Sequence, residues 1–309
     1  MNHFENVTSK RNKWYWYLLV LILCFAISNT IGAIPLYMLI IVYRISHGTL
    51  PIISSGNLGA LGFNLNLTFV AEVFPFVITL IAVILLIMLI HGRSWKEVIN
   101  GTNRVRWSRF FFGCLIWGII SLILFVISYF SDPEVFTFRF DPVNFFILLI
   151  IALLFVPFQA STEEFLFRGY IAQGVASWTK SRWCALIIPA IIFGLMHSIN
   201  PEVREYGLCI MMSHYIFFGL MFSFMSIMDD GIELAMGVHT VNNLFGTTFV
   251  TYKASALQTY ALFELTEFNP ADDIIPFIIS GIALVAICAY KYKWNLRIIN
   301  RKIEYGVQL

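Results

Sequence analysis

The chain has 309 residues, of which 59% are apolar and only 12% are charged, and its formal net charge is +2. Soluble domains carry roughly 25% charged residues, so this composition excludes an ordinary soluble globular domain. Together with a mean hydropathy of +0.79, it indicates an integral membrane protein with several spans.

Apolar runs long enough to cross a bilayer recur along the whole chain. A spanning helix needs roughly 20 mostly apolar residues, so we predict an all-α, polytopic membrane helical bundle with about eight transmembrane helices. The predicted spans cover residues 14–42, 67–90, 110–130, 145–159 and onward, 183–196, 208–228, 232–250 and 274–290. The first run is longer than one bilayer crossing and contains Pro35, which predicts a kink. Gly237 and Gly246 in the seventh run are expected to let neighbouring helices approach closely.

The Lys and Arg residues are distributed unevenly between the predicted loops. If both termini are cytoplasmic and eight spans alternate, 16 of the 20 Lys and Arg residues fall on the cytoplasmic side. Cytoplasmic loops carry such an excess, so we expect the N- and C-termini to be cytoplasmic. The basic segment 93–109, which contains Trp95 and Trp107, is interpreted as an anchor at lipid headgroups and not as a nucleic-acid site.

Two adjacent carboxylates follow the fourth apolar run, within the segment 161–170. Charges in apolar surroundings are expensive unless they are paired or functional. On a helix, Glu164 and Arg168 lie one turn apart on the same face and can pair. Glu163 is rotated by about 100° from Glu164 and faces elsewhere. Taken alone, this segment can also be a charge cluster at a helix end.

Two later spans each carry a histidine with a partner four residues away. The fifth predicted span contains Phe193 and His197, and the seventh contains His239 and Asn243. Each pair shares one helical face. Taken alone, each also has a plainer interpretation, as an interfacial histidine or as hydrogen bonding between helices.

Taken together, these polar groups predict a catalytic site inside the membrane. A carboxylate and an imidazole can deprotonate a water molecule, and a second imidazole with an amide can donate hydrogen bonds to an oxyanion. One carboxylate and two imidazoles are equally a common ligand set for a catalytic zinc ion with an open position. The spacing in the sequence does not separate these two chemistries.

The three motifs also occur together in a known family. They read E-E-x-x-x-R at 163–168, F-x-x-x-H at 193–197 and H-x-x-x-N at 239–243. In these motifs and their order the chain resembles the CPBP intramembrane proteases, which include the CAAX prenyl endopeptidases and the bacteriocin-processing and immunity proteins of the Abi type. The whole chain, 1–309, is expected to form a single integral membrane domain, and the resemblance covers its core at 145–251.

The resemblance implies an intramembrane endopeptidase that hydrolyses a peptide bond of a membrane-associated protein or peptide. It implies that Glu163 and His197 together activate the attacking water. It also implies that His239 and Asn243 stabilise the oxyanion. These four residues are the expected catalytic residues.

The resemblance assigns supporting roles to further residues of the motifs. Glu164 and Arg168 are expected to brace the site, and Phe193 belongs to the same supporting set. The mechanism is expected to need no metal and no other cofactor. The alternative is a zinc-dependent form of the protease, in which Glu163, His197 and His239 hold the metal.

Two functions without proteolysis remain as alternatives. The first is a membrane scaffold or partner-stabilising protein of the same fold, which would bind a membrane-protein partner. The second is a transporter that uses Glu163 as a proton relay, although the chain lacks the repeated halves typical of transporters. The expected surroundings are the lipid bilayer and a membrane-associated substrate, with no nucleic acid. Because no eukaryotic targeting tail is recognisable, we expect a bacterial cell membrane.

Overall fold

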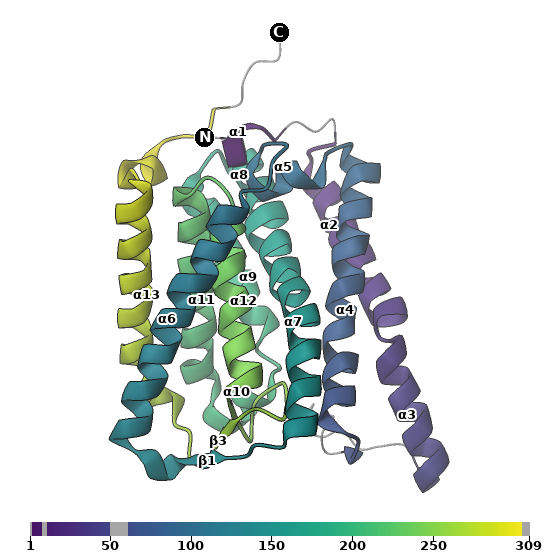
Figure 1. Cartoon of the computed structure of the whole chain (residues 1–309). Helices are drawn as coiled ribbons and strands as arrows, with labels where there is room; N and C mark the ends of the chain where they lie inside the picture. Colours follow the sequence, from purple (N-terminus) through teal and green to yellow (C-terminus); the bar gives the residue numbers. More distant parts are fainter. Residues whose placement is uncertain (1, 8–10, 50–60, 305–309) are drawn as a thin grey trace.

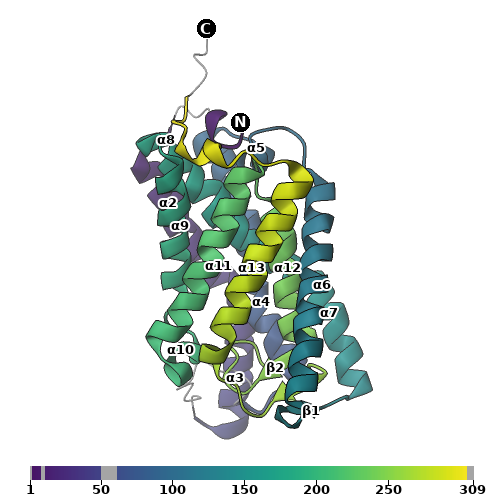
Figure 2. The same ribbon diagram turned by 90° about the vertical axis from the view of Figure 1, so that its left-hand side faces the viewer.

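The computed structural model describes residues 2–7, 11–49 and 61–304. These residues form a bundle of helices that run between two ends (Figure 1). The marks for the N- and C-termini both lie at one end, which we call the terminal end. Three short β-strands lie at the opposite end, which we call the strand end (Figures 1 and 2).

The helices follow one another along the chain with short connections. The first half contains α1 (Asn2–Glu5), α2 (Trp14–Ile27), η1 (Ser28–Gly32), α3 (Ile34–His47), α4 (Leu65–Leu86), η3 (Ile87–His91), α5 (Trp95–Asn100), α6 (Trp107–Ser131) and η4 (Pro133–Val135). The second half contains α7 (Pro142–Glu164), η5 (Phe165–Ile171), α8 (Ala172–Thr179), α9 (Arg182–Met196), α10 (Pro201–Tyr206), α11 (Leu208–Met228), α12 (Glu233–Thr248), α13 (Pro270–Tyr292) and η6 (Leu296–Asn300). The segments η1, η3 and η5 are π-helical, whereas η4 and η6 are 3₁₀ turns.

The all-α, polytopic architecture is confirmed, but the expected count of about eight spans is not. Within the described part of the chain, six helical stretches are long and apolar enough to cross a membrane. They are Trp14–Gly32, Leu65–His91, Trp107–Ser131, Pro142–Thr179, Leu208–Met228 and Pro270–Tyr292. The two predicted spans that fall short correspond to α9 and α12.

These two helices fall short for different physical reasons. With 15 residues, α9 is about 22 Å long, which is less than the ~30 Å hydrocarbon core of a bilayer. The helix α12 packs against α6, α7 and α11, so most of its surface meets protein instead of lipid. An enclosed helix does not need the apolar composition by which spans are recognised.

The first predicted run is interrupted where Pro35 predicted a kink. It forms α2, the π-helical turn η1 and then α3, with Ala33 between them in a non-helical conformation. Gly32 lies directly against α4, because a Cβ added there would be only 3.0 Å from the Cα atom of Pro75. The break therefore coincides with a close contact between two helices.

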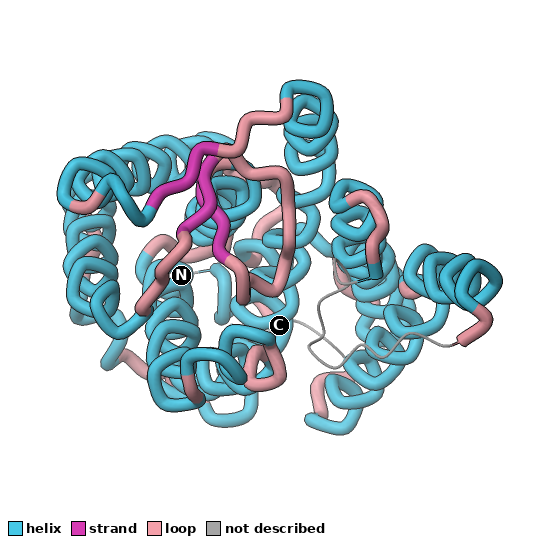
Figure 3. Tube along the Cα trace, turned by 90° about the horizontal axis from the view of Figure 1, so that it is seen from below, coloured by secondary structure: helices cyan, strands magenta, loops and turns pink. Residues whose placement is uncertain are grey.

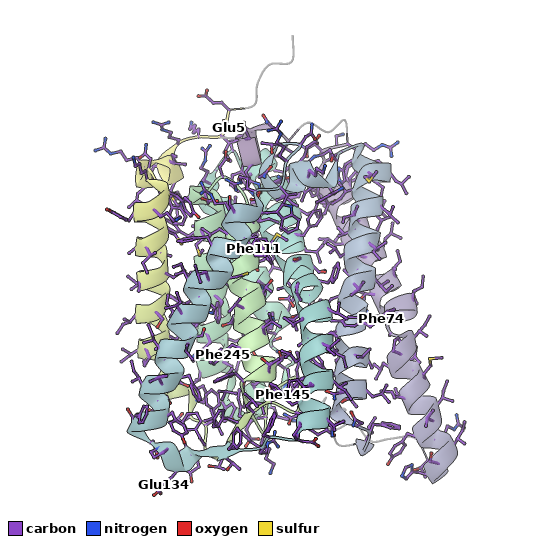
Figure 4. The ribbon with its side chains drawn as sticks, in the orientation of Figure 1. Glu5, Phe74, Phe111, Glu134, Phe145 and Phe245 are labelled. Carbon is purple, nitrogen blue, oxygen red and sulfur yellow. The ribbon has the colours of Figure 1, made fainter. Side chains whose placement is uncertain are left out.

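Large apolar side chains cover the outside of the bundle between its two ends. Figure 4 labels Glu5 and Glu134 at opposite ends, with Phe74, Phe111 and Phe245 at levels between them. Exposed apolar residues recur along α2, α3, α6 and α7. A soluble protein rarely exposes such a continuous apolar surface, so this belt is the face that meets lipid.

Glycines set the close packing of α6 against α12. A Cβ added to Gly237 would lie 2.0 Å from the carbonyl oxygen of Phe110, and one added to Gly113 would lie 2.5 Å from that of Leu234. The expectation of close approach is therefore confirmed for Gly237. It is wrong for Gly246, which has no atom within 4 Å of the corresponding position because it borders open space.

Buried ion pairs close the terminal end of the bundle. Arg106 lies 2.6 Å from Glu233 and 3.2 Å from Asp229, and Arg109 lies 3.1 Å from Asp229. The headgroup interpretation of the basic segment 93–109 is therefore wrong for these two arginines. They are drawn inward because the buried carboxylates at the start of α12 need counter-charges.

The three short strands cover part of the strand end, as the view from below shows (Figure 3). They are β1 (Phe136–Phe138), β2 (Val250–Tyr252) and β3 (Phe263–Leu265), in the order β1-β3-β2. The pair β1–β3 is antiparallel and the pair β2–β3 is parallel. Strands of three residues are too short to show a period-two pattern, so the sequence did not predict them.

Local interactions fix the position of α7, which carries the paired carboxylates. Asp141 caps its N-terminus by accepting a hydrogen bond from the backbone N–H of Asn144. Farther along, the Thr162 hydroxyl donates to the carbonyl oxygen of Phe76 on α4, at 2.9 Å. Apolar residues of α4 and α7 form a shared core, namely Phe69, Val73, Leu148, Ala152 and Val156.

Candidate active site

A cavity of about 250 Å³ lies between α7, α9, α11 and α12 and extends to the segments at the strand end. Its inner wall includes all four predicted catalytic residues, Glu163, His197, His239 and Asn243. Its outer wall includes Glu202 of α10 together with residues from β2 and the loop that follows. The structure therefore brings the side chains from three sequence-distant motifs into one cavity.

Glu163 is buried but borders this cavity. Its side chain is only 10% exposed. Its Oε1 atom accepts a hydrogen bond from the Gln159 amide at 3.0 Å, and its Oε2 atom lies 3.6 Å from Nε2 of His239. These contacts hold the carboxylate in one orientation while it faces the open space.

Glu164 points away from the cavity and forms a fully buried ion pair with Arg168. The distance between Arg168 Nη1 and Glu164 Oε1 is 2.9 Å, and both side chains are 0% exposed. The α-helix ends at Glu164, and Arg168 lies in the π-helical turn η5 that follows. Removing one partner of a buried pair costs roughly 3–5 kcal/mol, so this pair fits the bracing role that was expected for it.

Arg168 is also enclosed by aromatic rings. Its Cζ atom lies 4.2 Å from the ring centroid of Phe193, and its Nη2 atom donates to the carbonyl oxygen of Gly219 at 3.3 Å. Phe193 in turn lies 4.6 Å from the ring of His197. Phe193 thus packs between the bracing arginine and a histidine of the cavity wall.

His239 contacts both carboxylates at once. Its Nδ1 atom lies 2.8 Å from Oε1 of Glu164, and its Nε2 atom faces Glu163. Because an ionised carboxylate only accepts, Nδ1 carries a proton and donates it to Glu164. The ring also stacks on Phe222 with centroids 5.1 Å apart. These contacts fix its orientation, so Nε2 is the atom that faces the cavity.

His197 lies at the end of α9, on another wall of the cavity. Its Nδ1 atom is 2.8 Å from the carbonyl oxygen of Phe193, and since a carbonyl only accepts, Nδ1 carries the proton. In the neutral ring the lone pair is then on Nε2. The ring stacks on Tyr215 with centroids 4.5 Å apart. Among the described residues, no hydrogen bond joins His197 to Glu163, so the predicted pair is not in direct contact.

Asn243 is connected to Glu163 through one intervening side chain. The Asn243 amide donates to Oε1 of Gln159 at 2.9 Å, while the Gln159 amide donates to Glu163. Asn243 Oδ1 accepts a hydrogen bond from Asn242 at 3.1 Å. Because an amide nitrogen carries two protons, Asn243 has one further donor beyond its contact with Gln159.

Sequence reasoning missed Gln159, Tyr215 and Glu202 as parts of this site. Gln159 could have been found, because it precedes Glu163 by four residues and a helix places such pairs on one face. Tyr215 and Glu202 belong to no motif, and their positions follow only from the packing of α10 and α11 around the cavity.

The expected ligand set for zinc does not form in this arrangement. Across residues 2–7, 11–49 and 61–304, no three His, Cys, Asp or Glu side chains converge closely enough to hold a metal ion. His239 is directed at two carboxylates, and Nε2 of His197 is not grouped with them. The side chains of Glu163, His197 and His239 therefore do not fit a zinc ion in the conformation described.

Comparison with known proteins identifies similar sequences. The model of a family described as type II CAAX prenyl endopeptidase, Rce1-like, matches residues 142–245, which contain all three motifs. The chain is also 30% identical over 207 residues to the uncharacterized protein YyaK of Bacillus subtilis (strain 168). That alignment covers 65% of this chain and 69% of the relative. No solved structure matches the chain.

Proposed function

The chain belongs to the Rce1-like family of type II CAAX prenyl endopeptidases, and from this premise we propose that it hydrolyses a peptide bond of a membrane-associated protein or peptide. The observation that carries this proposal is the cavity shared by Glu163, His197, His239 and Asn243. Holding these polar groups in an apolar bundle is expensive unless they act. A scaffold alone would not need them.

The proposed nucleophile is a water molecule bound between Glu163 and His197. The Glu163 carboxylate borders the cavity, and Nε2 of neutral His197 carries a lone pair. Either group can accept a proton as the water attacks the carbonyl carbon, and the proton then passes to the leaving amine. General acid–base catalysis of this kind contributes about 10²–10⁴-fold to a rate.

The proposed oxyanion donors are His239 and Asn243. Asn243 retains one amide proton beyond its bond to Gln159. His239 donates from Nδ1 to Glu164, so Nε2 can donate to the oxyanion when the ring carries both protons. Preorganised donors of this kind contribute about 10²–10³-fold each. The ion pair of Glu164 with Arg168 keeps His239 in place.

We also propose an orientation for this integral membrane protein. The excess of Lys and Arg near the predicted cytoplasmic loops supports cytoplasmic termini in a bacterial cell membrane. The cavity extends to the strand end, which lies opposite the termini. Substrate would then enter from the outer side of the membrane.

The test is hydrolysis by purified protein in lipid vesicles, with a library of membrane-anchored peptides as substrates. We expect Glu163→Gln and His197→Ala to lower kcat/KM by about 10²–10⁴-fold. Matched controls are Glu205→Gln and His47→Ala, since both of these side chains are exposed. Thermal unfolding of each variant separates loss of catalysis from loss of folding.

Two outcomes would contradict parts of this proposal. Cleavage at the wild-type rate by both Glu163→Gln and His197→Ala would rule out the proposed chemistry and favour a scaffold. Loss of cleavage after exhaustive chelation, with recovery on adding Zn²⁺, would favour the zinc-dependent alternative. We expect cleavage to survive chelation.

A further inference from the structure

The cavity wall carries a second carboxylate that the proposed mechanism does not use. Glu202 of α10 lines the cavity together with Glu163. Among the described residues that line this cavity, none is Lys or Arg. The cavity therefore presents two carboxylates and no permanent positive charge to whatever enters it.

Glu202 is buried and only partly satisfied. It is 5% exposed. Its Oε1 atom accepts a hydrogen bond from the backbone N–H of Ala256 at 2.7 Å, and the Tyr252 hydroxyl lies 3.4 Å away. Its Oε2 atom is buried and has no hydrogen-bond partner among the described residues.

The other buried carboxylates differ from Glu202 in this respect. Within the described part of the chain, each of them lies within 4.0 Å of a basic side chain: Glu163 and Glu164 of His239, Asp229 and Glu233 of Arg106. Glu202 has no such neighbour. A buried charge without a partner is costly, so a ligand that supplies a positive charge would gain free energy at this position.

Glu202 is also close to the catalytic groups. Its charge acts on His197. Tyr215 stacks on His197, and its hydroxyl accepts a hydrogen bond from Asn200 at 3.2 Å. Because Glu202 and His197 line one cavity, a group that binds Glu202 belongs to the part of the substrate near the cleaved bond.

We propose that Glu202 determines substrate specificity by binding a positively charged Lys or Arg side chain of the peptide, near the bond to be cleaved. This inference rests on the proposed function for its link to cleavage, but the binding step can be measured separately. The hydrogen bond from Ala256 orients Oε1, and the unpartnered Oε2 is the atom available to the ammonium or guanidinium group.

The experiment measures binding of labelled peptides to purified protein in lipid nanodiscs. Each peptide has one apolar spanning segment followed by ten neutral residues, and Lys, Arg, Gln or Glu replaces one of these at a time. Hydrogen bonds to charged groups are worth roughly 1.5–3 kcal/mol, so we expect Lys or Arg to bind at least about tenfold more tightly than Gln at one or two positions.

Two variants separate the charge of Glu202 from its structural contacts. Glu202→Gln retains an acceptor for the Ala256 N–H but removes the charge, so the preference for Lys over Gln should disappear. Glu202→Lys should reverse the preference toward Glu. The matched control is Glu205→Gln, which removes an exposed carboxylate from the same helix and should leave the preference unchanged.

The outcomes distinguish this inference from the proposed function. Cleavage of these peptides without any wild-type preference for Lys or Arg overturns the inference and leaves the proposed function standing. A preference that depends on Glu202 in the absence of cleavage supports the inference and contradicts the proposed function. A preference that persists in Glu202→Gln overturns the inference. Should both variants fail to fold, the wild-type scan still decides, because no preference at any position overturns it.

Discussion

The side chain of Gln159 joins the two halves of the proposed catalytic site. It donates to Glu163 and accepts from Asn243, so one amide orients both the base and an oxyanion donor. We expect Gln159→Met to lower kcat by about 10²-fold with little change in KM, because small misplacements of catalytic groups carry a loss of that size. The measurement is steady-state cleavage of a membrane-anchored peptide.

The control for this prediction lies on the same helix. Thr162 is also buried on α7, but its hydroxyl bonds to the carbonyl oxygens of Phe76 and Phe158 and not to the site. Thr162→Val should therefore retain far more activity than Gln159→Met. Equal losses in the two variants would indicate that Gln159 acts only by supporting the packing of α7.

The sequence could predict those contacts of the site that lie within one helix. The pairing of Glu164 with Arg168 follows from their spacing of four residues, and the structure contains this ion pair. It could not predict that Glu202 meets the N–H of Ala256, because 54 residues separate the two and no periodicity spans that distance. Contacts of this kind depend on how α10 and the loop after β2 pack together.

Among the helices, sequence reasoning succeeded where the helix meets lipid and failed where it is enclosed. Hydropathy reports the composition that a lipid-facing surface requires. The helices α4, α6 and α13 expose apolar residues and were predicted as spans. The helix α12 is surrounded by α6, α7 and α11 and can carry His239 and Asn243 because of that enclosure. Its polar composition and its failure to qualify as a span thus have one cause.

The contact between α6 and α12 gives a prediction at the scale of the helix. A Cβ at position 237 would meet the carbonyl oxygen of Phe110 at 2.0 Å, so Gly237→Ala must separate the two helices. We expect a loss of about 1–3 kcal/mol in the free energy of unfolding, which is typical of overpacking. The measurement is unfolding in detergent micelles.

The matched control is the same substitution two turns farther along α12. Gly246 has no atom within 4 Å of the added Cβ. Alanine is favoured over glycine in helices by about 0.5–1 kcal/mol, so Gly246→Ala should be neutral or stabilising. If both substitutions changed the stability equally, the close contact at Gly237 would not be what limits α12.

Across the whole molecule, the two ends of the bundle differ in how they are closed. The terminal end is closed by the ion pairs of Arg106 and Arg109 and by α1, which packs against α5 and α8. At the strand end, the cavity extends to the loop that follows β2. This asymmetry means that the proposed catalytic groups are reached from the end without the ionic layer.

The short helix α1 joins this closure through His3. The imidazole Nε2 atom lies 3.1 Å from the carbonyl oxygen of Arg168, so it donates there. The Nδ1 atom lies 3.4 Å from the amide nitrogen of Gln173, which can donate to it only while the ring is neutral. The backbone N–H of His3 donates to Asp230. A second proton on the ring would therefore oppose the contact with Gln173.

This geometry predicts how the stability of the fold depends on pH. Burial lowers the pKa of His3 to about 4 from its ordinary 6.5, against the opposing effect of Asp230. Between these two values the unfolded chain binds a proton that the folded chain does not, so the free energy of unfolding falls as the pH falls. The stabilisation is complete above pH 6.5 and is lost toward pH 4, by up to about 3 kcal/mol.

The test compares the wild type with His3→Phe by unfolding in detergent micelles from pH 7.5 to 4.5. Burial raises the pKa of Asp229 to about 6, and this carboxyl acts in the opposite direction, since the folded chain takes up its proton first. Asp229 is present in both proteins, so the difference between their slopes isolates His3. We expect the wild type to lose more stability than the variant as the pH falls. Parallel curves would mean that His3 is not held neutral against Arg168, and that α1 closes the terminal end without a titrating contact.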